Sequence, residues 1–461
     1  MYKLGKYAIT SGIKFNIIMS DIIGVDKAVF YSLLAKSWGV ISFPVTILLI
    51  ARCFTPEVQG YYYTFNSLLM IQTLLELGFN VVLVQFISHQ WGSLSIAEDK
   101  QIKGSPIAMS QLASLLILGA RWYGSLSVIF LLLASAVGAL FLDRPGGIVD
   151  FKYPWWALCL AVSLNLLVVP IRSFLDGTNR VYKNQQLHLV SYVLSSVVGW
   201  CGIYFGAKLY SAALMSLTIF LVSIIMLCPS IVQYFSILKH RDIAHRISWR
   251  NDFWPQQWRI GVSWLSGFFM FQSFVPIVFH VNGPIAAGQM GVTIQIYNSI
   301  NSIAQSWLSA VSPQFGILWS QRKYQELRKL IKSTYLRSVV AATFFVCSLL
   351  LLIVVLQLLR APLLKRISDL YSLSIFMLVL VLMQLSNVET TAIRFQTKEP
   401  FLSVSVVSAI LVVTSNCILG YYYGITGVAN GFAAVMILFT IPGVHRIFIR
   451  EINKNHEGLI H

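Results

Sequence analysis

The sequence predicts an all-α polytopic membrane protein, with about twelve transmembrane helices arranged as two six-helix bundles. Hydrophobic residues make up 57% of the chain and charged residues only 11%, with a mean hydropathy of +0.72, which excludes an ordinary soluble domain. Apolar runs long enough to cross a bilayer recur along the whole chain. Lys and Arg residues gather in alternate connections between those runs, as the topology of a membrane protein requires.

The predicted spans fall into two sets, separated by a basic connection. The first set lies at residues 33–50, 60–88, 122–142, 153–175, 187–207 and 212–232. The second set lies at residues 260–281, 285–317, 339–359, 370–388, 401–421 and 425–444. As a helix, the 60–88 run is roughly 43 Å long, so it must tilt or bend in a hydrocarbon layer of roughly 30 Å. Residues 106–119 are expected to form a short amphipathic helix on the membrane surface, before the third span begins near Arg121.

The basic residues predict that both termini are cytoplasmic. With this topology, all but seven of the 34 Lys and Arg residues lie on the cytoplasmic side; the exceptions are Arg52, Arg144, Lys152, Lys208, Arg360, Lys365 and Arg366. One mistaken span would exchange the two sides downstream, so the bias supports an even number of spans. The net charge of +17 therefore follows membrane topology, and no nucleic acid partner is expected.

The two halves of the sequence resemble each other at two landmarks. Residues 55–60 align with residues 283–288, and the surroundings of Arg172 parallel those of Arg394. Because each half has an even number of spans, the repeats are related by an axis near the membrane normal. The expected organisation is a cytoplasmic or interfacial lead-in (1–35), a six-helix bundle (36–235), a basic cytoplasmic connection (236–259), a second six-helix bundle (260–446) and a cytoplasmic tail (447–461).

The span at 60–88 carries a polar face. If it is one continuous helix, Asn66 and Glu76 share an arc with Tyr62, Thr73 and Asn80. A carboxylate at membrane depth costs about 2.5–3.5 kcal/mol on insertion scales, so such a Glu usually faces a water-filled cavity or a cationic partner. Asn66 and Glu76 are therefore candidate cavity residues.

The span at 285–317 is the most polar one. Its amides and hydroxyls share a face about 120° wide, and its candidate substrate-binding residues are Gln295, Asn298, Asn301 and Gln305. Such a stripe indicates the lining of a cavity. The alternative is that these side chains bond neighbouring helices, as polar residues in membrane bundles often do.

Four basic residues are candidates for binding an anionic headgroup. Arg172 and Arg394 occupy equivalent cytoplasmic ends of the fourth and tenth spans, and Lys36 and Arg121 are weaker candidates of the same kind. Arginine suits phosphate because its forked donors match the phosphate oxygens. The alternative is that these side chains only extend to the interface and set the topology.

Other chemistry finds little support in the sequence. The six Cys residues are scattered singly without a CxxC spacing, which favours small apolar packing residues over a disulfide or metal framework. The sequence contains no Walker loop, no histidine-containing metal motif and no nucleophile constellation. We therefore expect neither an enzyme nor a cofactor or metal site.

Three stretches carry a resemblance to a known family. They are residues 31–41 (YSLLAKSWGVI), residues 50–67 (IARCFTPEVQGYYYTFNS) and Glu76-Leu77-Gly78. They resemble Wzx-type polysaccharide flippases, which belong to the superfamily that also contains multidrug exporters of the MATE class and lipid II flippases. The resemblance implies a MATE-like, V-shaped pair of six-helix bundles around a central, often cationic cavity. It also implies a polyprenyl-pyrophosphate-linked oligosaccharide as substrate and the bacterial inner membrane as location.

Three functions compete. The first is a flippase for an undecaprenyl-pyrophosphate-linked repeat unit of O-antigen, capsule or a related glycan, with a polysaccharide polymerase or assembly complex as a candidate partner. The second is a MATE-like multidrug or cation antiporter, against which stands the scarcity of acidic residues in the spans, where Glu76 and Glu389 are the main ones. The third is a membrane scaffold within a glycan assembly complex. Neither the glycan nor the driving gradient can be read from the residues.

Overall fold

The computed structural model describes residues 27–96, 102–144, 149–238, 249, 253–321, 323–393 and 400–457. Nearly all of this part of the chain is helical. The exception in regular structure is a short hairpin in which β1 (Leu94–Ile96) pairs antiparallel with β2 (Ile102–Gly104). The predicted class, an all-α membrane protein, is confirmed.

The helices up to residue 238, which we call the first half, are α2 (Lys27–Cys53), α3 (Pro56–Leu69), α4 (Ile71–Glu76), α5 (Phe79–Trp91), α6 (Pro106–Phe141), α7 (Lys152–Leu166), α8 (Val169–Gly177), α9 (Val181–Tyr204) and α10 (Tyr210–Leu238). Those of the second half are α11 (Trp254–Gln272), α12 (Phe274–Asn282), α13 (Pro284–Ser320), α14 (Tyr324–Leu358), α15 (Leu370–Ile393), α16 (Leu402–Val435) and α17 (Ile441–Glu457). Two short segments join them: η2 (Pro362–Arg366) and the π-helical η3 (Met436–Thr440).

The described helices agree with the predicted spans. Eight are long and apolar enough to cross a membrane, and ten if each of two bent pairs counts as one span. The run Leu402–Glu451 is one of these, but its 50 residues would reach about 75 Å, more than twice a hydrocarbon layer. The chain reverses direction within this run at Gly424, which has a φ of 61° and a ψ of −143°. This backbone conformation is accessible essentially to glycine alone. Dividing this run and adding the long polar helix α13 gives the predicted set of about twelve.

Two spans are broken. Leu77 and Gly78 both have positive φ, and the helices on either side of them are bent by 46°. Ser273 separates α11 from α12, with a bend of 44°. The first break means that the 60–88 run is not one helix, so the single polar face predicted for it is wrong. Tyr62 is buried, whereas Asn66 is exposed.

Other boundaries also differ from the prediction. Residues 106–119 do not form a separate surface helix, because α6 continues through them to Phe141 and buries one side, including Leu112 and Leu116. Among the described residues, α2 includes Lys27 and the residues that follow it, and α17 includes residues up to Glu457, so parts of the expected lead-in and tail are helical. None of the six Cys residues forms a disulfide, and Cys159 alone among them is buried.

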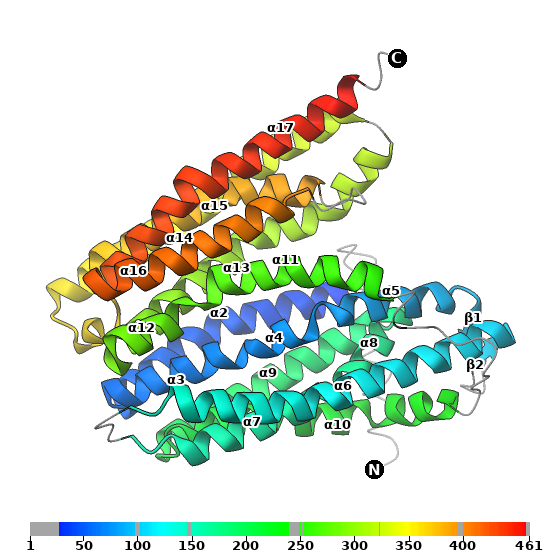
Figure 1. The fold of residues 1–461 in the computed structure, drawn as a ribbon, viewed down its shortest axis with the longest axis horizontal. Helices are drawn as coiled ribbons and strands as arrows, with labels where there is room; N and C mark the ends of the chain where they lie inside the picture. Colours follow the sequence, from blue (N-terminus) through cyan, green and yellow to red (C-terminus); the bar gives the residue numbers. More distant parts are fainter. Residues whose placement is uncertain are drawn as a thin grey trace, which may run out of the picture.

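Each half packs mainly within itself. In the first half α2 packs on α9, α9 on α10 and α10 on α7, while in the second half α14 packs on α13 and α15, and α11 on α16. Figure 1 shows α14–α17 on the opposite side of the molecule from α6, α7 and α10, with α11 lying between the two groups. The main contact between the halves is that of α3 with α13.

The start of α3 is built by local sequence. The Thr55 side chain accepts a hydrogen bond from the Val58 amide, and Pro56 occupies the first turn, where no amide donor is needed. In the first turns of α3, Gly60 packs against Pro284 and Gly288 of α13. The approach is so close that a Cβ on Gly60 would collide with the Pro284 backbone. Glycine is therefore required for the contact between α3 and α13.

Candidate functional site

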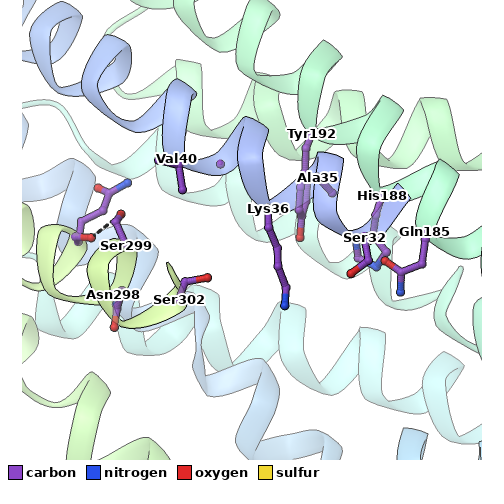
Figure 2. Close-up of a pocket in the computed structure, with 12 residues that line it drawn as sticks. Ser32, Ala35, Lys36, Val40, Gln185, His188, Tyr192, Asn298, Ser299 and Ser302 are labelled. Atoms are coloured by element: carbon purple, nitrogen blue, oxygen red, sulfur yellow. Dashed lines mark hydrogen bonds between the residues drawn. The ribbon is translucent and has the colours of Figure 1, made fainter. Parts of the chain in front are cut away.

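A cavity of about 400 Å³, lined by both polar and apolar groups, lies between α2, α9 and α13, and so between the two halves (Figure 2). This is the usual size of a small-molecule site. It is lined by Ser32, Ala35, Lys36, Gly39 and Val40 of α2, Gln185, His188 and Tyr192 of α9, and Gln295, Asn298, Ser299 and Ser302 of α13. None of these lining residues is acidic, and Lys36 is the formal cation among them.

Lys36 lies at the centre of this cavity. Figure 2 shows its side chain extending from α2 into the space between Ser302 of α13 and His188 of α9. The side chain is exposed, so its ammonium group is free to meet a ligand. Of the three basic candidates that the structure describes, Lys36 is the one that lines the cavity.

Arg172 lies one layer behind the cavity wall. It sits on α8 and is half-buried, and its Nε donates to Asn184 Oδ1 over 3.0 Å. A terminal nitrogen of Arg172 also contacts the ring of His188, which lines the cavity. Asn184 in turn donates to Asp176 over 2.7 Å. Arg172 is therefore held by α9 and acts on the cavity through His188.

The polar stripe of α13 divides between two roles. Gln295 and Asn298 line the cavity, as does Ser302. Asn301 instead accepts a hydrogen bond from Gln384 of α15 over 3.1 Å and another from Gln305 over 3.2 Å. Both alternatives considered for the stripe thus hold, each for a different part of it.

The remaining candidates lie outside the lining of this cavity. Asn66 donates to the Tyr62 carbonyl of its own helix over 3.0 Å. Glu76 ends α4 and accepts from Gln72 over 3.0 Å and from the Tyr123 hydroxyl over 3.5 Å. Arg121 is exposed on α6. Arg394 lies outside the described residues.

The contribution of α9 was missed in the sequence. Gln185, His188 and Tyr192 recur at intervals of three and four residues, which places them on one helix face. That spacing is the signal in the sequence that points to this helix face. Among the described residues no group of three or more His, Cys, Asp or Glu side chains is placed to hold a metal ion.

The halves are joined by hydrogen bonds at the end of the bundle away from Lys36. Arg366 of η2 donates to the carbonyls of Ala51, over 3.2 Å, and Phe54, over 2.5 Å, at the end of α2. Gln59 of α3 donates to the carbonyls of Gly288 and Arg366, each over 3.1 Å. We call these contacts the Arg366 latch.

A second arginine reaches across in the opposite direction. Arg144, which follows α6, donates to the His280 carbonyl of α12 over 2.7 Å and lies over the Phe279 ring at 5.4 Å. Each half therefore sends one guanidinium to backbone or ring groups of the other. Arg144 and Arg366 both belong to the predicted non-cytoplasmic side, and the cavity lies toward the opposite end of α2.

Comparison with known proteins identifies the fold. No family model matches the chain, and no curated protein matches its sequence. A multidrug resistance MATE family transporter of the MOP superfamily, in an inward-facing conformation, has a TM-score of 0.63 at 15% identity over 96% of this chain and 98% of that chain. The lipid II flippase MurJ, in an inward closed conformation, has a TM-score of 0.57 at 14% identity over 94% and 92%.

A third similar structure is a MOP superfamily transporter from Pyrococcus furiosus, for which a binding pocket of reverse polarity is described as suggesting a different function. Its TM-score is 0.57 at 16% identity, over 93% of this chain and 96% of that chain. The chain thus has a MATE-like transporter fold along almost its whole length.

Proposed function

We propose that this protein is a flippase that moves an undecaprenyl-pyrophosphate-linked oligosaccharide, a repeat unit of O-antigen, capsule or a related glycan, across the bacterial inner membrane. The observation that carries the proposal is the cavity between the halves, whose described lining combines Lys36 with amides and hydroxyls and contains no carboxylate. An anionic, hydroxyl-rich headgroup fits this lining better than a cationic drug does.

Different lining residues are suited to different parts of the headgroup. Lys36 offers its ammonium to a phosphate, and Arg172 adds positive charge from behind His188. Gln185, Gln295 and Asn298 carry the amide donors and acceptors that sugar hydroxyls require. The cavity needs to hold only the polar headgroup, because the prenyl chain is as apolar as the lipid and can remain in it.

Alternating access is supported by the contrast between the two ends of the molecule. The Arg366 latch and the Arg144 contacts hold the halves together at the predicted periplasmic end, while the cavity separates α2 and α9 from α13 toward the predicted cytoplasmic end. The structure is then a cytoplasm-facing state, and release on the other side requires both sets of arginine contacts to break.

The proposed topology has both termini in the cytoplasm, six spans in each of two bundles (36–235 and 260–446), and a cytoplasmic connection at 236–259. The hydrogen-bonded ends of α2 and α12 then face the periplasm, in agreement with the distribution of basic residues. Labelling of single cysteines introduced at positions 239 and 454 with a membrane-impermeant maleimide checks this topology. Reaction from the periplasmic side at either position contradicts it.

A MATE-like multidrug or cation antiporter is the second candidate. The fold is compatible with it, and Glu76 favours it, because this half-buried carboxylate could bind a cation or a proton. The position of Glu76 argues against it, because Glu76 is not among the residues that line the cavity. A scaffold in a glycan assembly complex, with a polymerase as neighbour, is the third candidate and requires no cavity.

Reconstituted vesicles distinguish the three functions. Purified full-length protein is placed in vesicles containing a fluorescent undecaprenyl-pyrophosphate-linked oligosaccharide, and movement between leaflets is measured by quenching from outside. A flippase increases the rate, an antiporter instead moves ethidium against a pH or sodium gradient, and a scaffold does neither. The Lys36→Gln variant must slow the glycan movement, while Lys329→Gln, an exposed lysine of α14, serves as the matched control.

A further inference from the structure

A buried carboxylate in the second half lies outside the cavity and has no part in the proposed function so far. Glu389 of α15 is only 3% exposed. Its Oε1 lies 2.6 Å from Nδ1 of His445 on α17, and Tyr335 of α14 lies near the same carboxylate. Burying an ionised carboxylate is costly unless it is paired and hydrogen-bonded. Three helices therefore meet at one polar group in an apolar bundle.

Among the described residues, His445 is the basic side chain that pairs with this carboxylate. The apolar cluster of the same helices, from α13, α14, α15, the start of α16 and α17, contains Leu308, Phe315, Ile331, Val388, Ala392, Phe401, Val404, Val444 and Phe448. The basic residues described nearby on α14 and α17 are all exposed: Lys332, Arg337, Arg446 and Arg450. An imidazole can change its charge near neutral pH, unlike a Lys or Arg partner.

A π-helical segment precedes His445. This segment, η3, widens the backbone between Met436 and Thr440, and Pro442, two residues later, has no amide donor. Single π-helical turns are frequent at functional sites. Beyond η3, α17 is held to α15 by apolar contacts and by the polar pair with Glu389.

We propose that Glu389, His445 and Tyr335 form a proton-binding site, and that its occupancy determines how α17 is held against α15. In the unoccupied state, neutral His445 donates its Nδ1 proton to the Glu389 carboxylate. The incoming proton binds Nε2, because the His445 side chain is 56% exposed and its neighbours Arg446 and Arg450 place this face near water. The ion pair then carries no net charge, whereas the unoccupied pair carries one negative charge.

The two states place different demands on the packing. With the proton bound, the pair carries no net charge, and the Glu389 carboxylate can stay buried between α14, α15 and α17. Without it, the buried carboxylate lacks a counter-charge, and water must approach it to replace the lost interaction. Loss of the proton therefore loosens α17 from α15. A pH difference across the membrane can thereby bias the second half, independently of any substrate in the cavity.

The test measures the distance between α14 and α17 without substrate. Spin labels are attached at Lys329 and Ile449, both exposed, on a cysteine-free background of the full-length protein in lipid nanodiscs, and pulsed electron paramagnetic resonance records the distance distribution from about pH 5.5 to about pH 8.5. The unmodified pair should show two populations whose ratio changes about tenfold over this range. A distribution that is the same at every pH overturns the proposal.

Variants identify the titrating group. His445→Gln should give the alkaline distribution at every pH, because Gln can donate to the carboxylate but cannot accept the proton. His445→Lys should give the acid distribution at every pH, because it keeps a permanent charge. His89→Gln, which replaces an exposed histidine of α5, should respond to pH as the parent does. A pH response that persists in His445→Lys refutes the site even if His445→Gln does not fold.

Discussion

The hydrogen bonds of the Arg366 latch give an estimate of how strongly the halves are held together at the predicted periplasmic end. Arg366 donates to two backbone carbonyls of the first half at 2.5 and 3.2 Å, and lies 3.4 Å from Gln59 Oε1. A hydrogen bond to a charged group contributes about 1.5–3 kcal/mol, and we take about 1 kcal/mol each because the side chain is only half-buried. Arg366→Gln should therefore weaken closure by about 2 kcal/mol, which multiplies the open-to-closed ratio by roughly 30.

The opening can be followed at Tyr63. This residue is buried on α3 against Gly291 of α13, so a thiol placed there reacts only when the halves separate. Tyr63→Cys is introduced on a cysteine-free background, and the initial rate of reaction with a membrane-impermeant maleimide is measured from the periplasmic side. Arg366→Gln should raise this rate by roughly 30-fold, and Arg366→Lys by less, because Lys keeps the charge without the fork.

The neighbouring Lys365 supplies the control. It lies in the same short helix and is exposed, so Lys365→Gln removes a charge at nearly the same place without touching the carbonyls at the end of α2. Its labelling rate should equal that of the parent. If Arg366→Gln reacts within twofold of the parent, or if Lys365→Gln accelerates the reaction as much, then the hydrogen bonds of Arg366 do not hold the halves together.

Three further predictions concern the cavity and its surroundings. Lys36→Gln should weaken binding of inorganic pyrophosphate to the purified protein by about tenfold, measured by calorimetry, whereas Arg121→Gln, outside the cavity, should leave it unchanged. Arg172→Gln should lower glycan transport at matched membrane abundance and Arg172→Lys should keep part of it; full activity of Arg172→Gln would end its proposed role. Glu76→Gln should fold normally and retain glycan transport if the flippase proposal is right, since Glu76 does not line the cavity, whereas loss of transport with normal folding would favour a coupling role.

The positions of most spans could be predicted because hydropathy is a local property of the chain. The reversal near Gly424 and the long helix from Pro284 were both anticipated, since each is encoded by composition within a window of about 20 residues. The break at Leu77 was not, because a leucine with positive φ reflects packing around it and not its own preference. The continuity of α6 was missed for the same reason: its first turns are stabilised by burial against other helices.

The candidate site was only partly predictable. Gln295 and Asn298 were found because a polar stripe in an apolar helix is conspicuous, and Lys36 because it is a charge in an apolar run. Asn301, with the same chemistry, turns to Gln384 instead, and no helical wheel can tell which neighbour lies on each side. The Arg366 latch could not be predicted from the sequence, for a further reason. Its Arg366 side chain bonds residues more than 300 positions away through backbone carbonyls, which every residue possesses.

The tight reversal at Gly424 has a consequence for how the protein is made. With almost no loop between them, the last two spans contact each other from the turn onward, Gly427 against Leu419 and Gly431 against Ser415. During synthesis these two spans can therefore enter the membrane together, as one helical hairpin. A ribosome that stopped near Gly424 would leave residues 402–423 without the segment that packs against Leu419 and Ser415. Residues 425–444 thus decide whether the preceding span is inserted correctly.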